Sequence, residues 1–157
     1  MKLTFLVIGK TVDSHLQALI GDYQKRLGFY MPFDYICIPE LKNTKNLSEA
    51  EQKEKEGELL LKQLATSDYV VLLDEHGKEF RSVDFAKFIE NKILASQKNL
   101  VFVVGGPYGF SESVYKRANE KLSLSKMTFS HQMVRLIFVE QLYRAMTILK
   151  GEPYHHE

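Results

Sequence analysis

The chain has 157 residues, of which 45% are hydrophobic and 26% are charged, and its formal net charge is +1. These values predict one globular domain over residues 1–157 with a sizeable core, and they exclude a protein coated with basic residues. No apolar run approaches the ~18 residues of a membrane-spanning helix. The first apolar stretch lacks a cleavage site, so we expect a cytoplasmic protein. The single cysteine, Cys37, lies in an apolar stretch, which predicts a packed and inert thiol.

Apolar runs alternate with amphipathic segments along the first half of the chain. Strands are predicted at residues 3–8, 33–38 and 69–73, and helices at 14–28 and from residue 48 onward. Ser14 and Ser48 each stand three residues before Gln or Glu, which predicts a capping box at the start of each helix. A polar loop is expected at residues 74–78, directly after the third strand.

The second half continues the alternation. Apolar residues with helical spacing between 85 and 93 predict a helix, which precedes the most apolar strand at residues 100–104. A short helix is expected from Ser111, a strand or extended loop at 122–129, and a long amphipathic helix at 131–150. Alternating helices and apolar strands indicate an α/β fold with a mostly parallel sheet flanked by helices. Ligands bind beyond the carboxyl ends of such strands, which selects the loops after Leu73 and Val104.

A glycine-rich loop follows the fourth predicted strand. Gly105, Gly106 and Gly109 free the backbone to adopt positive φ and to approach a ligand closely, which suits a nucleotide-like cofactor. A tight turn without a ligand is the alternative interpretation. The loop is neither a GxGxxG motif nor a Walker motif, so the pattern does not indicate phosphate binding.

The segment 122–129 is apolar, but it is rich in hydroxyl groups and lies between two predicted helices. Its backbone could read an adenine edge while Leu124, Met127 and Phe129 pack on the ring faces. The alternative is an ordinary edge strand.

The last predicted helix has a broad apolar face that fits the core, a subunit interface or both. Arg135 and Arg144 on this helix are candidate partners for phosphates or carboxylates, with solvated surface charges as the alternative. In the tail, His155 and His156 are adjacent, but no cysteine or acidic cluster completes a ligand set, so no metal is expected. The remaining interpretation is a tail that folds over a site and supplies polar groups.

Several segments taken together resemble the RlmH family of SPOUT methyltransferases over essentially the whole chain. The matching pieces are Leu73-Asp74 with Gly77-Lys78, the loop 105–109, the segment 124–129, His131 with Val134-Arg135, residues 140–145 and residues 153–155. The resemblance implies a SPOUT-type knotted fold with a trefoil knot near the C-terminus, and a homodimer. It also implies S-adenosylmethionine-dependent N3-methylation of a pseudouridine, position 1915 in helix 69, of 23S large-subunit rRNA. We expect the protein to meet this rRNA within an assembled ribosome, because its balanced charge favours a large preformed surface.

The resemblance also assigns residues. The family's cofactor contacts correspond to Leu73, Gly105 and the segment 124–129, to which we add Gly106 and Gly109. That segment consists of Leu124, Ser125, Lys126, Met127, Thr128 and Phe129. For catalysis we expect His155 as the base, Tyr154 positioning it, and Arg135 and Arg144 stabilising negative charge. Where the family often ends His-Arg-Glu, this chain has His155-His156-Glu157, which weakens an RNA role for position 156.

Two other functions remain open from the sequence. A non-catalytic RNA-binding or ribosome-assembly module on the same fold would bind RNA without a cofactor. A nicotinamide-dependent enzyme is disfavoured because Gly9 is the only glycine directly after the first strand. Neither the target nucleotide nor the choice between naked rRNA and an assembled ribosome is written in the residues, although the balanced charge favours a large preformed surface.

Overall fold

The computed structural model describes residues 1–156, and Glu157 lies outside the described residues. One sheet of five strands has the order β2-β1-β4-β3-β5, and every pairing in it is parallel. The strands are β1 (Lys2–Ile8), β2 (Phe33–Ile38), β3 (Tyr69–Glu79), β4 (Asn99–Val104) and β5 (Glu120–Ser123). The helices are α1 (Ser14–Gly28), α2 (Glu49–Lys62), α3 (Ser82–Leu94), α4 (Glu112–Arg117) and α5 (Met133–Leu149), with a 3-10 turn at Thr44–Asn46. The α/β architecture predicted from the alternation is confirmed.

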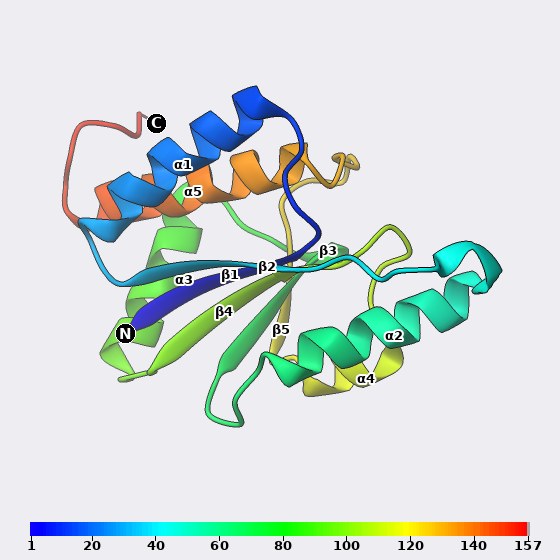
Figure 1. The fold of residues 1–157 in the computed structure, drawn as a ribbon. Helices are drawn as coiled ribbons and strands as arrows, with labels where there is room; N and C mark the ends of the chain where they lie inside the picture. Colours follow the sequence, from blue (N-terminus) through cyan, green and yellow to red (C-terminus); the bar gives the residue numbers. More distant parts are fainter. Residues whose placement is uncertain (157) are drawn as a thin grey trace.

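The helices divide between the two faces of the sheet (Figure 1). Helices α1, α3 and α5 cover one face, and α2 and α4 cover the other. Because successive strand residues point to opposite faces, Phe5 belongs to the α5 side and Leu6 to the α2 side. Phe138 of α5 is fully buried, and its ring centroid lies 4.9 Å from that of Phe5 and 4.8 Å from that of Phe102. The broad apolar face of the last helix therefore packs on the sheet.

The helix starts test the two predicted capping boxes. Ser48 forms a complete box with Glu51 at the start of α2, which confirms that prediction. The prediction for Ser14 is wrong, because Asp13 is the N-cap of α1. Its carboxylate accepts the amide N–H groups of His15 at 2.8 Å and Leu16 at 3.1 Å, and these bonds lower the pKa of Asp13. The carboxylate of Asp13, one residue before Ser14, thus satisfies amide N–H groups of the first turn that have no partner within the helix.

Strand β3 is longer than predicted. The polar loop expected at 74–78 is wrong, because β3 continues to Glu79 and pairs again with β5 after a register shift between Leu73 and Lys78. A Cβ on Gly77 would stand 2.6 Å from the backbone nitrogen of Leu122, so only glycine permits this close approach. The bulge turns the polar residues between Leu73 and Gly77 out of the ladder.

Strand β2 forms one edge of the sheet, and this changes the environment of Cys37. The prediction of a packed thiol is wrong, because Cys37 is exposed. The other edge, β5, ends at Ser123, and the rest of the predicted segment 122–129 is a loop that leads towards α5. That loop lies at the same end of the sheet as the carboxyl ends of β3 and β4.

Candidate functional site

The bulged part of β3 and the carboxyl ends of β4 and β5 surround a pocket of about 430 Å³, within the roughly 300–1,000 Å³ of ligand sites. Its walls come from residues 73–76, residues 104–110, the segment 122–129 and the start of α5. Nine of the ten residues predicted to bind the cofactor line it: Leu73, Gly105, Gly106, Gly109, Leu124, Ser125, Met127, Thr128 and Phe129. Lys126 does not line the pocket and is exposed. The pocket lies where the rule for parallel sheets placed it.

The three glycines of the loop are needed for different reasons. Gly109 has a φ of +82° and donates its N–H to the carbonyl of Gly106 at 3.1 Å, which closes the turn. A Cβ on Gly105 would lie 3.0 Å from the ring of Phe110, and a Cβ on Gly106 would meet the carboxyl group of Glu56. At these two positions the space of the missing side chain is therefore limited by Phe110 and Glu56 of the protein itself.

Hydrogen bonds join the segments around the pocket. Tyr115 of α4 donates its hydroxyl to the carboxylate of Asp74, and Thr128 donates to Glu75 at 3.1 Å. Burial and the bond to Asp74 raise the pKa of Tyr115 to about 12, so this hydroxyl remains a donor at neutral pH. Ser125 accepts the amide N–H of Met127 at 3.0 Å. The bond from Thr128 to Glu75 therefore ties the loop after β5 to the bulged part of β3.

The charge of the pocket limits its ligands. Asp74 and Glu75 contribute carboxylates, His76 and His131 contribute imidazoles, and no lysine or arginine of residues 1–156 lines it. The strongest contacts that proteins offer a phosphate come from arginine and lysine, and the start of α5 supplies only uncharged backbone donors to this pocket. The lining therefore favours a neutral or cationic ligand with apolar parts.

Arg135 lies outside this pocket and does not behave as a solvated charge. It is only 2% exposed, and its guanidinium donates to the carbonyls of Gly9 at 2.8 Å and Ile8 at 2.9 Å. It also donates to the hydroxyl of Thr11 at 3.1 Å and to the carbonyl of His131 at 3.0 Å. The interpretation as a surface charge is wrong, and the observed contacts fasten α5 to the connection between β1 and α1.

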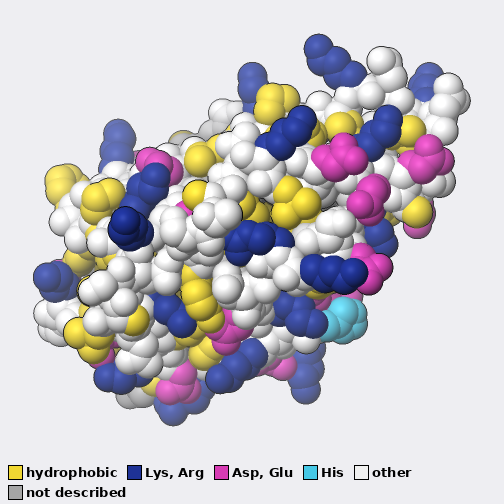
Figure 2. Space-filling view, turned by 90° about the horizontal axis from the view of Figure 1, so that it is seen from below, with side chains coloured by type: hydrophobic (Ala, Val, Ile, Leu, Met, Phe, Trp, Pro, Cys, Tyr) yellow, Lys and Arg dark blue, Asp and Glu magenta, His cyan; other side chains and the backbone are white. Residues whose placement is uncertain are grey.

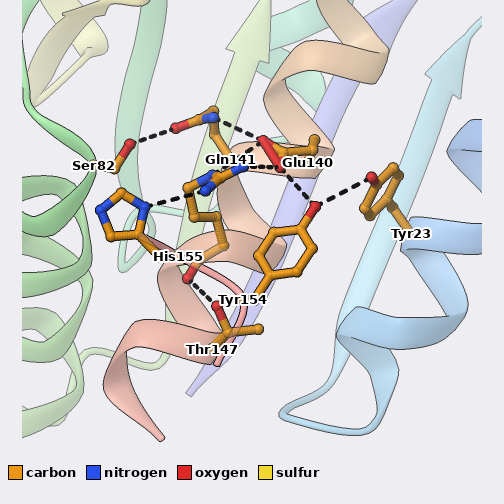
Figure 3. Close-up of polar contacts among 8 residues, drawn as sticks. Tyr23, Ser82, Glu140, Gln141, Thr147, Tyr154 and His155 are labelled. Atoms are coloured by element: carbon orange, nitrogen blue, oxygen red, sulfur yellow. Dashed lines mark hydrogen bonds and ion pairs between the residues drawn. The ribbon is translucent and has the colours of Figure 1, made fainter. Parts of the chain in front are cut away.

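The other three predicted catalytic residues form one cluster on α5 (Figure 3). Glu140 accepts hydrogen bonds from Tyr154 at 2.8 Å and from Arg144 at 2.9 Å. Arg144 also contacts Nδ1 of His155 at 3.1 Å, and its guanidinium carbon lies 4.8 Å from the ring centroid of Tyr154. The hydroxyl of Tyr23 from α1 lies 3.4 Å from that of Tyr154. The tail is therefore ordered against α5 and α1.

Two electrostatic consequences follow from this cluster. Burial and the hydrogen bonds to Tyr23 and Glu140 raise the pKa of Tyr154, so its hydroxyl stays protonated at neutral pH. Arginine only donates hydrogen bonds, so Nδ1 of His155 is the acceptor and Nε2 carries the ring hydrogen in this arrangement. None of these residues lines the pocket, so the structure separates the tail cluster from the pocket of the same chain.

Sequence reasoning missed several residues of both sites. Glu140 organises the tail cluster, and its spacing of four residues from Arg144 is the one local signal that would have paired them. Tyr23 and Tyr115 carry no such signal, because their partners lie 131 and 41 residues away. Within residues 1–156, no group of three or more His, Cys, Asp or Glu could hold a metal ion, and no helix is long and apolar enough to cross a membrane.

Comparison with known proteins places the chain in a family. Residues 1–155 match the family model described as "Predicted SPOUT methyltransferase". Relatives from Phocaeicola vulgatus, Parabacteroides distasonis and Flavobacterium johnsoniae are 65%, 64% and 59% identical over 157 residues, and the alignments cover all of this chain and all of each relative. Each of the three is named ribosomal RNA large subunit methyltransferase H. The resemblance found in the motifs is confirmed, and the chain belongs to the SPOUT methyltransferase family.

Proposed function

We propose that this protein transfers a methyl group from S-adenosylmethionine to N3 of a pseudouridine in the large-subunit rRNA of cytoplasmic ribosomes, and that it works as a homodimer. Membership of a methyltransferase family supports the reaction class. The names of full-length relatives at 58–65% identity support rRNA as the substrate. The choice of cofactor is supported by the chemistry of the pocket.

The absence of lysine and arginine from the described pocket lining carries the cofactor assignment. S-adenosylmethionine has a sulfonium and an ammonium group against one carboxylate, so its net charge is positive and it has no phosphate. The carboxylates of Asp74 and Glu75 at the pocket complement that charge. Apolar side chains such as Leu124 and Phe129 offer packing surface for an adenine ring. A nicotinamide dinucleotide would bring two phosphates to a pocket without a cation to hold them.

The chemistry then depends on position and on one proton. S-adenosylmethionine supplies an activated methyl group, so the protein has to orient the acceptor nitrogen and stabilise the charge that forms when N3 loses its proton. In the tail cluster, Arg144 donates to His155, and Nε2 of His155 carries a hydrogen. This arrangement favours Arg144 as the donor that stabilises the N3 anion, while His155 takes the N3 proton and S-adenosylhomocysteine leaves. His155 stays the candidate base of this hypothesis, with Tyr154 positioning its ring.

A second copy of the chain would bring a tail cluster to each pocket. Arg144, Tyr154 and His155 are absent from the lining of their own pocket, although three of the four predicted catalytic residues meet in that cluster. Figure 2 shows lysine and arginine side chains interspersed with acidic and hydrophobic ones on the face seen from below, without one continuous basic area. Two subunits would place two such moderate surfaces against one RNA.

Isothermal titration calorimetry with S-adenosylmethionine tests the cofactor, with NADH as the control ligand. We expect saturable binding of S-adenosylmethionine at up to one per subunit and no binding of NADH. Methyl transfer to ribosomes from cells that lack the modification then tests the substrate. Binding of rRNA with no S-adenosylmethionine binding, even in the presence of ribosomes, would instead support a non-catalytic RNA-binding module.

Mixing two inactive variants tests the dimer. His155→Ala removes the tail group but keeps the pocket, and Gly105→Val disrupts the pocket but keeps the tail. If the tail serves the partner's pocket, a mixed dimer contains one complete site and methyl transfer returns on mixing. If each tail serves its own pocket, the mixture stays inactive, and the proposed exchange between subunits is wrong.

A further inference from the structure

We propose that Glu56 of α2 is a positioning residue of the cofactor site, which sets the shape of the glycine loop from the side opposite to the ligand. The proposal rests on the proposed cofactor pocket, but it assigns a role to a helix that contributes no residue to the lining of that pocket. Glu56 lies in the middle of α2, a helix that the family motifs in the sequence do not include.

The first observation is direct contact. A Cβ on Gly106 would stand 2.5 Å from Oε2 and 2.7 Å from Cδ of Glu56, so the carboxyl group fills the space of the missing side chain. Gly106 itself lines the pocket, whereas Glu56 does not. The backbone of the loop is therefore a thin wall between the ligand space and the carboxyl group, and a shift of either surface moves the other.

The second observation is an incompletely satisfied carboxyl group. Glu56 is only 5% exposed, and among the described residues its Oε1 has no hydrogen-bond partner. Oε2 has one long contact, 3.5 Å from the side-chain nitrogen of Gln52 on the same helix. Buried polar atoms without partners are rare, since each costs free energy of folding. An apolar side chain of similar size would avoid that cost.

The charge state follows from the surroundings. Burial raises the pKa of Glu56, the weak contact with Gln52 opposes this, and the nearby carboxylate of Glu40, in the segment after β2, adds to it. The glycine loop presents only backbone atoms to the carboxyl group at Gly106. The carboxyl group of Glu56 therefore stays neutral to a higher pH than its ordinary pKa of 4.5 would allow. When it ionises at higher pH, an anion lies against the loop. The loop is expected to shift when that happens.

The first experiment uses the protein without cofactor, so that it stays informative if S-adenosylmethionine does not bind. Backbone amide resonances of Gly105, Gly106 and Gly109 are followed by NMR from pH 3.5 to pH 8, a range that starts below the ordinary pKa of a glutamate side chain. We expect the Gly106 amide to move with one titration in the wild type and to lose that titration in Glu56→Gln. Glu58→Gln, an exposed change on the same helix, is expected to behave as the wild type. A Gly106 amide that does not titrate, or that titrates equally in Glu56→Gln, would overturn the proposal.

The second experiment measures the dissociation constant of S-adenosylmethionine over the same pH range. The wild type and Glu58→Gln are expected to lose affinity as pH rises, beyond any loss shown by Glu56→Gln, which keeps a neutral side chain. Glu56→Ala, which leaves the loop unsupported, is expected to bind about tenfold more weakly at every pH, a free-energy change of ~1.4 kcal/mol. Urea unfolding checks that each variant is folded. Unchanged affinity in folded Glu56→Ala would show that the side chain does not set the shape of the loop, and the proposal would be wrong.

Discussion

Replacing Arg135 with methionine tests whether this residue holds the fold together or takes part in catalysis. Methionine keeps most of the length of the side chain but removes all four hydrogen bonds to Ile8, Gly9, Thr11 and His131. A buried acceptor that loses its partner costs about 1–3 kcal/mol. The carbonyls of Ile8 and Gly9 account for most of the effect, and the acceptors on Thr11 and His131 add less. We therefore expect the free energy of unfolding to fall by about 3–5 kcal/mol. That is a large part of the total stability of a typical domain, roughly 5–15 kcal/mol.

Urea unfolding followed by circular dichroism gives the change in free energy. Lys25→Met, an exposed substitution on α1, is the matched control, and it should stay within about 0.5 kcal/mol of the wild type. Arg135→Lys keeps the charge but has fewer donors in a fixed fork, so its loss should be intermediate. If Arg135→Met unfolds like the control while methyl transfer disappears, the structural argument is refuted and Arg135 acts in the reaction.

Three further predictions concern single elements. Ser48→Ala removes the N-cap of α2 and should cost about 1 kcal/mol in urea unfolding; an unchanged midpoint would mean that solvent replaces the cap. Phe138→Ala empties a fully buried site between two aromatic rings and should cost about 3–5 kcal/mol, and a loss below 1 kcal/mol would show that the core there collapses around the gap. His155→Ala should abolish most methyl transfer while the affinity for S-adenosylmethionine, measured by calorimetry, stays the same. Equal loss of both would make the tail part of the cofactor site.

The edge of the sheet that holds the pocket could be predicted from sequence because it follows from the strands being apolar and parallel. Strands 69–73 and 100–104 are apolar runs of the right length, and parallel strands bring their carboxyl ends to one edge. Residues 73–76, which the structure shows to be part of β3, and the loop after Val104 therefore lie at the same end of the sheet. Local signals were sufficient here because neighbouring strands pair in register over the predicted residues.

Contacts between distant parts of the chain were not predictable. In the sequence Arg135 looks like an ordinary surface charge of a helix. Its partner carbonyls are 126 and 127 residues earlier, and since every residue has a backbone carbonyl, the sequence does not single them out. The continuation of β3 through Asp74 and Glu75 was missed for a related reason, since its pairing with β5 uses backbone groups and a bulge. Cys37 looked like a core residue because the position of β2 at the edge of the sheet depends on all the other strands.

The hydrogen bonds of Arg135 have a consequence for the order of events during synthesis. The carbonyls of Ile8 and Gly9 at the end of β1 emerge from the ribosome early, but the guanidinium that satisfies them lies on α5, the last helix of the chain. Until α5 has emerged, the part of that sheet face between α1 and α3 lacks Phe138 and its neighbours and stays open to solvent. Domains emerge N-terminal end first at about 5–20 residues per second, so the nascent chain exposes this apolar surface for several seconds. We therefore expect the incomplete chain to depend on protection from aggregation until its last helix has emerged.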